Sequence, residues 1–334
     1  MGTLLVDKKH EPGDYDSLLK LVREKKFRRD ENTPPSFDNE RQMYPSISAL
    51  IRFICDAIDE YSGDKEVKPL RGFDVYVHDK NKDKGESVYK WVDMGLVVST
   101  NKVNRPDRVD EGRPDYLNML TVIEAQIGSR NRDSLMNLCA YTWNLLARPY
   151  TRRFAWGLRF VQNTALAYVF GKGYVVSSNV MELGCEQGRR DFVRMLAYWS
   201  FCSIEQMGFD PSVRYIEEIN RHEIDIYDDE TKQISTLFIN GRSQIIGDPF
   251  CRHTVCLYCV EDQENLGTED FSKLVFVKNA WNRKEDPNDK QHKRSKEVEV
   301  LHKINRVLGQ REDLRGTYPE LVAAGTVHIK PTDL

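Results

Sequence analysis

The sequence contains no uninterrupted apolar run that approaches the ~18 residues needed to cross a bilayer as a helix. Its first residues, MGTLLVDKKHEPGDYD, become charged too early for a signal peptide. Gly2 follows the first methionine, but Val6 stands where a myristoylation signal needs serine or threonine. We therefore expect no membrane association and a cytoplasmic or nuclear location.

The sequence also lacks an excess of positive charge. It carries 49 lysines and arginines against 52 aspartates and glutamates, a formal net charge of −3. Proteins dedicated to nucleic acids usually carry a basic excess because they neutralise phosphates. Composition therefore argues against a nucleic-acid partner. Hydrophobic residues make up 40% and charged residues 30% of the chain, the balance of a globular protein long enough for two domains.

The seven cysteines are scattered, and without a secretory signal we expect no disulfides. One cluster, Cys251, His253, Cys256 and Cys259, resembles half of a zinc site. A structural zinc site normally pairs such a knuckle with a second one, which the sequence does not contain. Alternation along a strand would also point these side chains to opposite faces. We expect buried strand cysteines here rather than a metal site.

The first half of the chain reads as an α/β domain behind a flexible lead-in. Residues 1–40 are polar and charged, which is typical of a loosely attached segment. Apolar residues then recur at helical spacing over 46–61, with Ser46 as the expected N-cap. Apolar runs next predict strands at 72–77, 91–99 and 117–126, a helix at 133–147, strands at 153–161 and 165–171, and a helix at 190–203.

This order of a helix, three strands, a helix and a strand is that of the restriction-endonuclease-like core, which we expect over residues 41–222. In active members, a carboxylate on the second strand and a Glu-x-Lys on the third hold Mg²⁺ and polarise the attacking water. Here Asp93 lies on the second expected strand, and the third reads Glu124-Ala125-Gln126. Asp93 and Glu124 are thus candidate metal ligands of a Mg-dependent PD-(D/E)xK-type nuclease. Gln126 cannot supply the lysine's positive charge, which favours a degenerate, non-catalytic site.

The character of the chain changes near Glu223, where a charged stretch leads into a second domain, residues 223–334. Apolar runs predict strands at 234–240, 243–250, 253–262 and 273–281. A charged loop follows, then a helix from about Ser295 to Leu308 and a last strand at 320–329.

Two short motifs, Thr151-Arg152-Arg153-Phe154 and Gly208-Phe209-Asp210-Pro211, flank the segment Phe170-Gly171-Lys172-Gly173. In this order they resemble the fungal-type protein kinase family, and the resemblance runs from roughly residue 47 to the end of the sequence. In that family a kinase domain follows the N-terminal domain. The resemblance therefore implies that residues 223–334 form an incomplete kinase small lobe, an antiparallel sheet with one helix.

The apolar strand LVFVK ends in Lys278 and looks like the kinase strand whose lysine holds the α- and β-phosphates of ATP. Such a lysine is itself held by a carboxylate on the next helix. Glu297 shares the apolar stripe of that helix with Leu301 and Ile304, whereas Glu299 lies on the charged side. The resemblance therefore implies an ion pair between Lys278 and Glu297.

The chain departs from the family at the residues that do the chemistry. The family's Gly-Arg-Gly-Thr segment is replaced by Cys251-Arg252-His253-Thr254. Arg252 and Thr254 would remain from a vestigial nucleotide site, but without the glycines its backbone amides cannot approach a phosphate freely. Neither His-Arg-Asp nor Asp-Phe-Gly occurs after Lys278, so the base and metal ligands of phosphoryl transfer are missing from this sequence.

We therefore expect a pseudoenzyme, a catalytically inactive binding or regulatory module that binds ATP and Mg²⁺ weakly or not at all. A protein partner is expected to cover the exposed face of the small lobe. Two other functions stay open. A nuclease would need a surrogate for the missing lysine beside Asp93 and Glu124, and a plain protein-interaction module would need only an exposed apolar patch.

Overall fold

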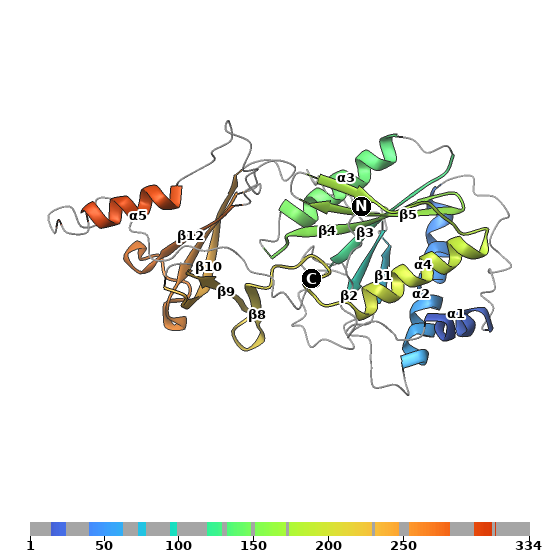
Figure 1. Ribbon diagram of the computed structural model, residues 1–334, viewed down its shortest axis with the longest axis horizontal. Coiled ribbons are helices and arrows are strands. Elements are labelled where there is room, and N and C mark those ends of the chain that lie inside the picture. Colours follow the sequence, from blue (N-terminus) through green and yellow to red (C-terminus); the bar gives the residue numbers. More distant parts are fainter. Residues whose placement is uncertain are drawn as a thin grey trace. The chain divides into compact units, whose positions relative to one another are not determined.

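The computed structural model describes residues 15–24, 40–62, 73–77, 94–98, 119–128, 132–147, 151–171, 174–228, 231–246, 254–280, 297–308 and 311. The described residues divide into two compact units, the first up to Asp210 and the second from Pro211 onward. Each unit contains one β-sheet, and the protein is of the mixed α/β class (Figure 1). The domain bounds expected from the sequence, 41–222 and 223–334, stay predictions. None of the described helices is long and apolar enough to cross a membrane.

The described strands of the first unit form a seven-stranded sheet in the order β1-β2-β3-β4-β5-β6, with β7 also paired to β5. Only β3 and β4 run parallel, and the crossover between them contains helix α3. The bounds are β1 Phe73–Val77, β2 Met94–Val98, β3 Met119–Gln126, α3 Arg132–Ala147, β4 Phe154–Val161, β5 Thr164–Gly171, β6 Tyr174–Ser177 and β7 Met181–Glu182. The first five strands and α3 confirm the elements predicted from apolar periodicity. The short strands β6 and β7 were not predicted.

Helices cover both faces of this sheet: α3 packs on one face, and α1 (Tyr15–Glu24), α2 (Glu40–Ser62) and α4 (Glu186–Phe201) lie on the other (Figure 1). The core on the latter side is aromatic. Trp156 of β4 meets Trp199 of α4 edge-to-face at 5.6 Å between ring centroids. Phe160 and Phe192 make a similar contact at 5.7 Å.

Two helices at the start of the chain differ from expectation. Helix α1 lies inside the segment expected to be a flexible lead-in, yet Leu18 and Leu19 are buried in the core. Helix α2 begins at Glu40, so Ser46 is inside it rather than its N-cap, and Pro45 is also inside. Pro45 is the sixth residue of the helix and removes one backbone hydrogen bond, and the apolar face that follows is long enough to keep the helix packed.

The two short motifs of the sequence pair with each other. Residues 151–154 and 208–210, here called the clasp, are joined by an antiparallel bridge between Arg152 and Phe209. The backbone N–H of Arg153 donates to the Gly208 carbonyl, and that of Asp210 donates to the Thr151 carbonyl, both at 2.7 Å. A segment that enters β4 is thereby fixed to the segment that follows α4.

Arg152 places its guanidinium at the centre of the clasp with only 1% of the residue exposed. It donates to the carbonyl oxygens of Met119 and Leu120 at the start of β3, and lies 4.1 Å from the ring centroid of Phe209. A buried cation is costly unless its donors are satisfied, so these contacts hold β3 to the clasp. Arg153 adds hydrogen bonds of 3.2 Å to the carbonyls of Glu205 and Phe209.

The second unit contains a meander of five described strands in the order β12-β11-β10-β9-β8, with every neighbouring pair antiparallel. The bounds are β8 Val213–Ile216, β9 Arg221–Tyr227, β10 Ile234–Ile246, β11 Thr254–Val260 and β12 Val275–Ala280, followed by helix α5 at Glu297–Leu308. Strands β11 and β12 and helix α5 confirm the predicted elements. The last expected strand, 320–329, lies outside the described residues.

Three elements of this sheet differ from expectation. The two strands predicted at 234–240 and 243–250 are one strand, β10, whose register against β11 shifts after Ile239 and again after Arg242. Each shift breaks the alternation of side chains, which is why the sequence looks like two strands. Strands β8 and β9 were not predicted because their charged residues resemble a loop.

We predict that Gly208→Ala strongly destabilises the first unit. Gly208 has φ +98°, and an added Cβ would lie 2.1 Å from the Phe154 carbonyl oxygen inside the clasp. We expect a loss of about 2–4 kcal/mol in unfolding free energy, from backbone strain plus the clash. Urea unfolding followed by tryptophan fluorescence measures it.

Gly128→Ala is the matched control, because Gly128 has φ +97° but open space around the added Cβ. It should cost only about 1 kcal/mol. Equal losses for the two variants would show that the clasp tolerates a side chain and that its close approach is unimportant.

Candidate functional site

Lys278 lies in β12, where it pairs in register with Cys256 of β11, and its side chain is exposed. Thr254 is the first residue of β11 and is buried. Arg252 lies outside the described residues, and so does the side chain of Glu297, the first residue of α5. The structure thus places Lys278 and Thr254 on neighbouring strands, and the ion pair between Lys278 and Glu297 stays a prediction.

The amphipathic character expected for α5 is present. Leu301, Ile304 and Leu308 are half-buried, whereas Lys303 and Arg306 are exposed. Two further apolar residues of the helix face solvent: Val300 is 49% and Val307 is 66% exposed. Of the residues whose side chains are described, none in α5 is buried, so much apolar surface of this helix stays open.

An exposed group of aromatic side chains, here called the aromatic face, shares one side of the sheet with Lys278. Phe276 stands two residues before Lys278 and therefore on the same face. Its ring meets that of Tyr258, its partner in register, at 5.9 Å, and Tyr258 meets Phe271 at 6.5 Å. Phe276 is 56% and Phe271 is 75% exposed. The opposite side of β11, with Val255, Leu257 and Cys259, is buried.

The cysteines of β11 confirm the expectation of buried strand cysteines. Cys256 and Cys259 are both buried, and burial raises the pKa of the Cys259 thiol to about 12. A thiol that keeps its proton this strongly is a poor metal ligand, because metals bind the thiolate. Cys251 and His253 lie outside the described residues. In the described ranges, no three histidine, cysteine or acidic side chains gather into a candidate metal site.

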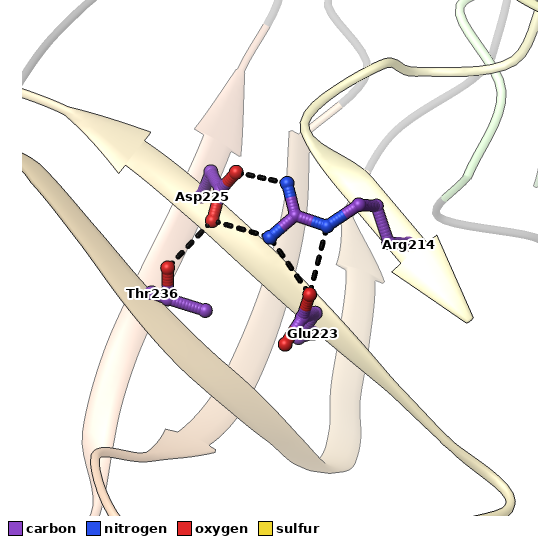
Figure 2. Close-up of polar contacts among 4 residues, drawn as sticks. All are labelled: Arg214, Glu223, Asp225 and Thr236. Carbon is purple, nitrogen blue, oxygen red and sulfur yellow. Dashed lines mark hydrogen bonds and ion pairs between the residues drawn. The ribbon is translucent and has the colours of Figure 1, made fainter. Parts of the chain in front are cut away.

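A network of charged side chains crosses the other end of the same sheet (Figure 2). Arg214 of β8 donates through Nε to Glu223 of β9 at 2.7 Å and through both terminal nitrogens to Asp225. Thr236 of β10 donates to the same Asp225 carboxylate at 2.7 Å. Register places all four residues on one face. A bidentate arginine–carboxylate ion pair is a strong contact between strands, so the network holds the edge strand β8 in place.

The network sets the protonation of Asp225. Burial acts to raise the pKa of this carboxyl, but hydrogen bonds from Arg214 and Thr236 and the charge of Arg214 outweigh it, and the pKa is lowered. The hydrogen bond to Asp225, followed by the one to Glu223, raises the pKa of the Arg214 guanidinium. The ion pair is therefore kept over the whole physiological range.

A second group of polar residues lies on β3 and β4, under helix α3. Glu124 is 3% exposed and accepts a hydrogen bond of 3.2 Å from Asn137 of α3. Gln126 accepts one of 3.2 Å from the guanidinium of Arg159, which pairs in register with Glu124 across the parallel strands. A buried cation thus stands beside the position where an active nuclease would carry lysine. Asp93 lies outside the described residues.

Sequence reasoning missed both Arg159 and the Arg214 network. Arg159 interrupts an otherwise apolar strand, and a charge in such a position signals a buried polar partner. A sign of the network is the alternation of Glu223, Ile224, Asp225 and Ile226, which is typical of a strand with one polar face.

We predict that Arg214→Gln raises the pKa of Asp225 and loosens β8. Because the folded pKa is lowered, the stability that this carboxylate contributes is present above its unfolded pKa of ~3.9 and is lost as pH falls through the lower folded value. In the unaltered protein, carboxyl NMR should therefore show Asp225 titrating below ~3.9. In Arg214→Gln the midpoint should move upward, and amide exchange in β8 should become faster.

The control for this titration is Arg221→Gln, which removes the same charge from an exposed arginine of β9 outside the network. It should leave the Asp225 midpoint close to that of the unaltered protein. An Asp225 pKa at or above its ordinary value, or one insensitive to Arg214→Gln, would contradict the prediction.

A comparison with protein-family models matches residues 92–312 to the model described as fungal protein kinase. The match spans more than half of the chain and includes the clasp, the polar group on β3 and β4, and Lys278. No curated protein and no solved structure matches the chain. The match thus includes both short motifs and Lys278, on which the resemblance in the sequence depends, and the chain belongs to the fungal protein kinase family.

Proposed function

We propose that this chain acts by binding, as a catalytically inactive regulatory module of its family. The observation that carries the proposal is the aromatic face, which lies on the same side of the sheet as Lys278. The wider expectation of a kinase small lobe rests on the family and on the antiparallel sheet that carries this lysine.

Phosphoryl transfer depends almost entirely on positioning and on charge stabilisation. In an active kinase, ATP with Mg²⁺ supplies the phosphoryl group, and a lysine, its carboxylate partner, a base and metal-binding side chains hold the reacting atoms. Of these, the described residues offer Lys278. The 334 residues contain no His-Arg-Asp and no Asp-Phe-Gly after it. The chain alone is therefore proposed to lack catalytic activity.

The surroundings of Lys278 favour a weak nucleotide site at most. A phosphate group near the lysine needs free backbone amides on the segment before β11, where this chain carries side chains in place of glycines. The loop between β11 and β12 carries Glu261, Asp262, Glu264, Glu269 and Asp270, all exposed. Their charge repels polyphosphates, and it also argues against a nucleic-acid partner.

The aromatic face is better suited to a protein. Exposed aromatic side chains that gather on one surface are enriched at the centres of protein interfaces, where they contribute most of the binding energy. The open apolar residues of α5, Val300 and Val307, add to the apolar surface of this unit. The acidic loop beside Phe271 favours a partner with basic residues around an apolar centre.

A degenerate nuclease is the second candidate, because Arg159 puts a buried cation beside Gln126 and Glu124. We propose a restriction-endonuclease-like core for the first unit on the strength of its parallel β3–β4 pair and the α3 crossover. Glu124 is nearly inaccessible and already bound to Asn137, which opposes metal binding. Mg²⁺-dependent cleavage of DNA or RNA that Glu124→Ala abolishes would instead favour the nuclease.

We predict that the purified chain transfers no radioactive phosphate from ATP to itself or to generic substrates, because the base and the metal ligands are missing. The assay compares the unaltered chain with Lys278→Met and with Lys273→Met, which removes another exposed lysine of the same unit. All three should stay at background.

Two patterns of labelling have different meanings in this assay. Labelling that disappears in Lys278→Met but persists in Lys273→Met would overturn the inactive assignment. Equal labelling in all three preparations would identify a contaminating kinase and would leave the inactive assignment unchanged.

A further inference from the structure

Strands β6 and β7 together form one outer edge of the seven-stranded sheet. Both pair with β5, and Ser178 continues the pairing between them. Its backbone N–H donates to the Ala167 carbonyl at 2.8 Å, and its hydroxyl accepts from the Ala167 N–H at 3.0 Å. Within the described part of the chain, no strand pairs with the other side of β6.

The part of this edge that β6 forms is apolar, uncharged and exposed. Tyr174 is 51%, Val175 is 47% and Val176 is 55% exposed, and no charged residue occurs from Tyr174 to Met181. Native proteins usually protect sheet edges with charges, prolines or covering segments, because an open edge is a template for another strand. The edge strand β8 of the other sheet has such protection in Arg214. Strand β6 has none.

The backbone groups that point away from β5 follow from the register. The N–H of Ser178 points inward, to Ala167, and successive residues of a strand alternate. Tyr174 and Val176 therefore also direct their N–H and C=O groups toward β5. Val175 and Ser177 direct theirs outward, with no described strand to receive them.

We propose that this edge pairs with the same edge of a second copy of the chain, antiparallel about a two-fold axis at Val176. In that register Val175 of each copy faces Ser177 of the other, and both residues exchange N–H···O=C hydrogen bonds. Every outward backbone group of the two residues is then used. If the axis lay at Val175 or at Ser177 instead, the residue on the axis would pair with its own copy. The outward N–H and C=O groups of the other residue would then be less well matched.

A second copy suits this edge better than an unrelated strand for reasons of charge and symmetry. An uncharged strand does not repel itself, and two-fold interfaces, in which the same patch serves both subunits, are the commonest in homo-oligomers. Tyr174, Val175 and Val176 alone fall well short of the ~800 Å² that each partner buries in a stable interface. The dimer is therefore weak and concentration-dependent, with a dissociation constant above about 1 μM.

Sedimentation velocity across a wide concentration range tests the dimer with Val176→Lys. At the two-fold axis the Val176 side chains face each other in a closely spaced pair, so this variant places two lysines in direct opposition. The unaltered chain should approach the dimer mass at high concentration, and Val176→Lys should stay monomeric. Met136→Lys, at a 56% exposed methionine of α3 in the same unit, is the control and should dimerise normally.

Val175→Pro tests the backbone pairing without adding charge. It removes an outward N–H and spares the ladder to β5, a position where edge strands accept proline. Circular dichroism should show the native fold, and the dimer should weaken at least tenfold. A monomer at every concentration, or a dimer insensitive to both variants, would overturn the proposal. A dimer lost only in Phe276→Ser would overturn it too, by moving the interface to the aromatic face.

Discussion

Arg152 is the constraint on which the first unit depends. Withdrawing a guanidinium from water is costly unless its donors find partners, and here both terminal nitrogens of Arg152 donate to the carbonyls of Met119 and Leu120 while the ring of Phe209 lies against its charge. Those contacts join the start of β3, the entry to β4 and the segment after α4. Asp210, the last described residue of the first unit, is hydrogen-bonded to Thr151 in the same clasp, so the point where the chain leaves this sheet is fixed as well.

The sequence predicted the elements whose apolar pattern is long and regular, and α3, β3, β4 and β11 lie within a few residues of expectation. It failed where side-chain contacts override the local pattern. Strand β9 looked like a charged loop because of its acidic residues. It forms a strand because Arg214, nine and eleven residues earlier in the chain, neutralises two of them. The clasp was visible only as two motifs, since the pairing of residues 57 positions apart in the chain cannot be deduced from their spacing.

The candidate site was predictable in its residues but not in its surroundings. Apolar periodicity and the family resemblance place Lys278 at a strand, and the structure agrees. The aromatic face was not foreseen, because Tyr258, Phe271 and Phe276 come together only through the register of β11 with β12. Arg159 was missed for the same reason, since its contact with Gln126 depends on the parallel pairing of β3 with β4. The aromatic face favours a binding function over nucleotide chemistry, whereas Arg159 is what keeps a nuclease as the second candidate.

Titration calorimetry of the purified chain with ATP and Mg²⁺ separates a binding module from a nucleotide-dependent enzyme, since a module without a working nucleotide site should not need ATP. We expect no saturable heat below millimolar nucleotide, with Lys278→Met indistinguishable from the unaltered chain. Micromolar affinity, about −8 kcal/mol of binding free energy, that Lys278→Met abolishes would contradict it.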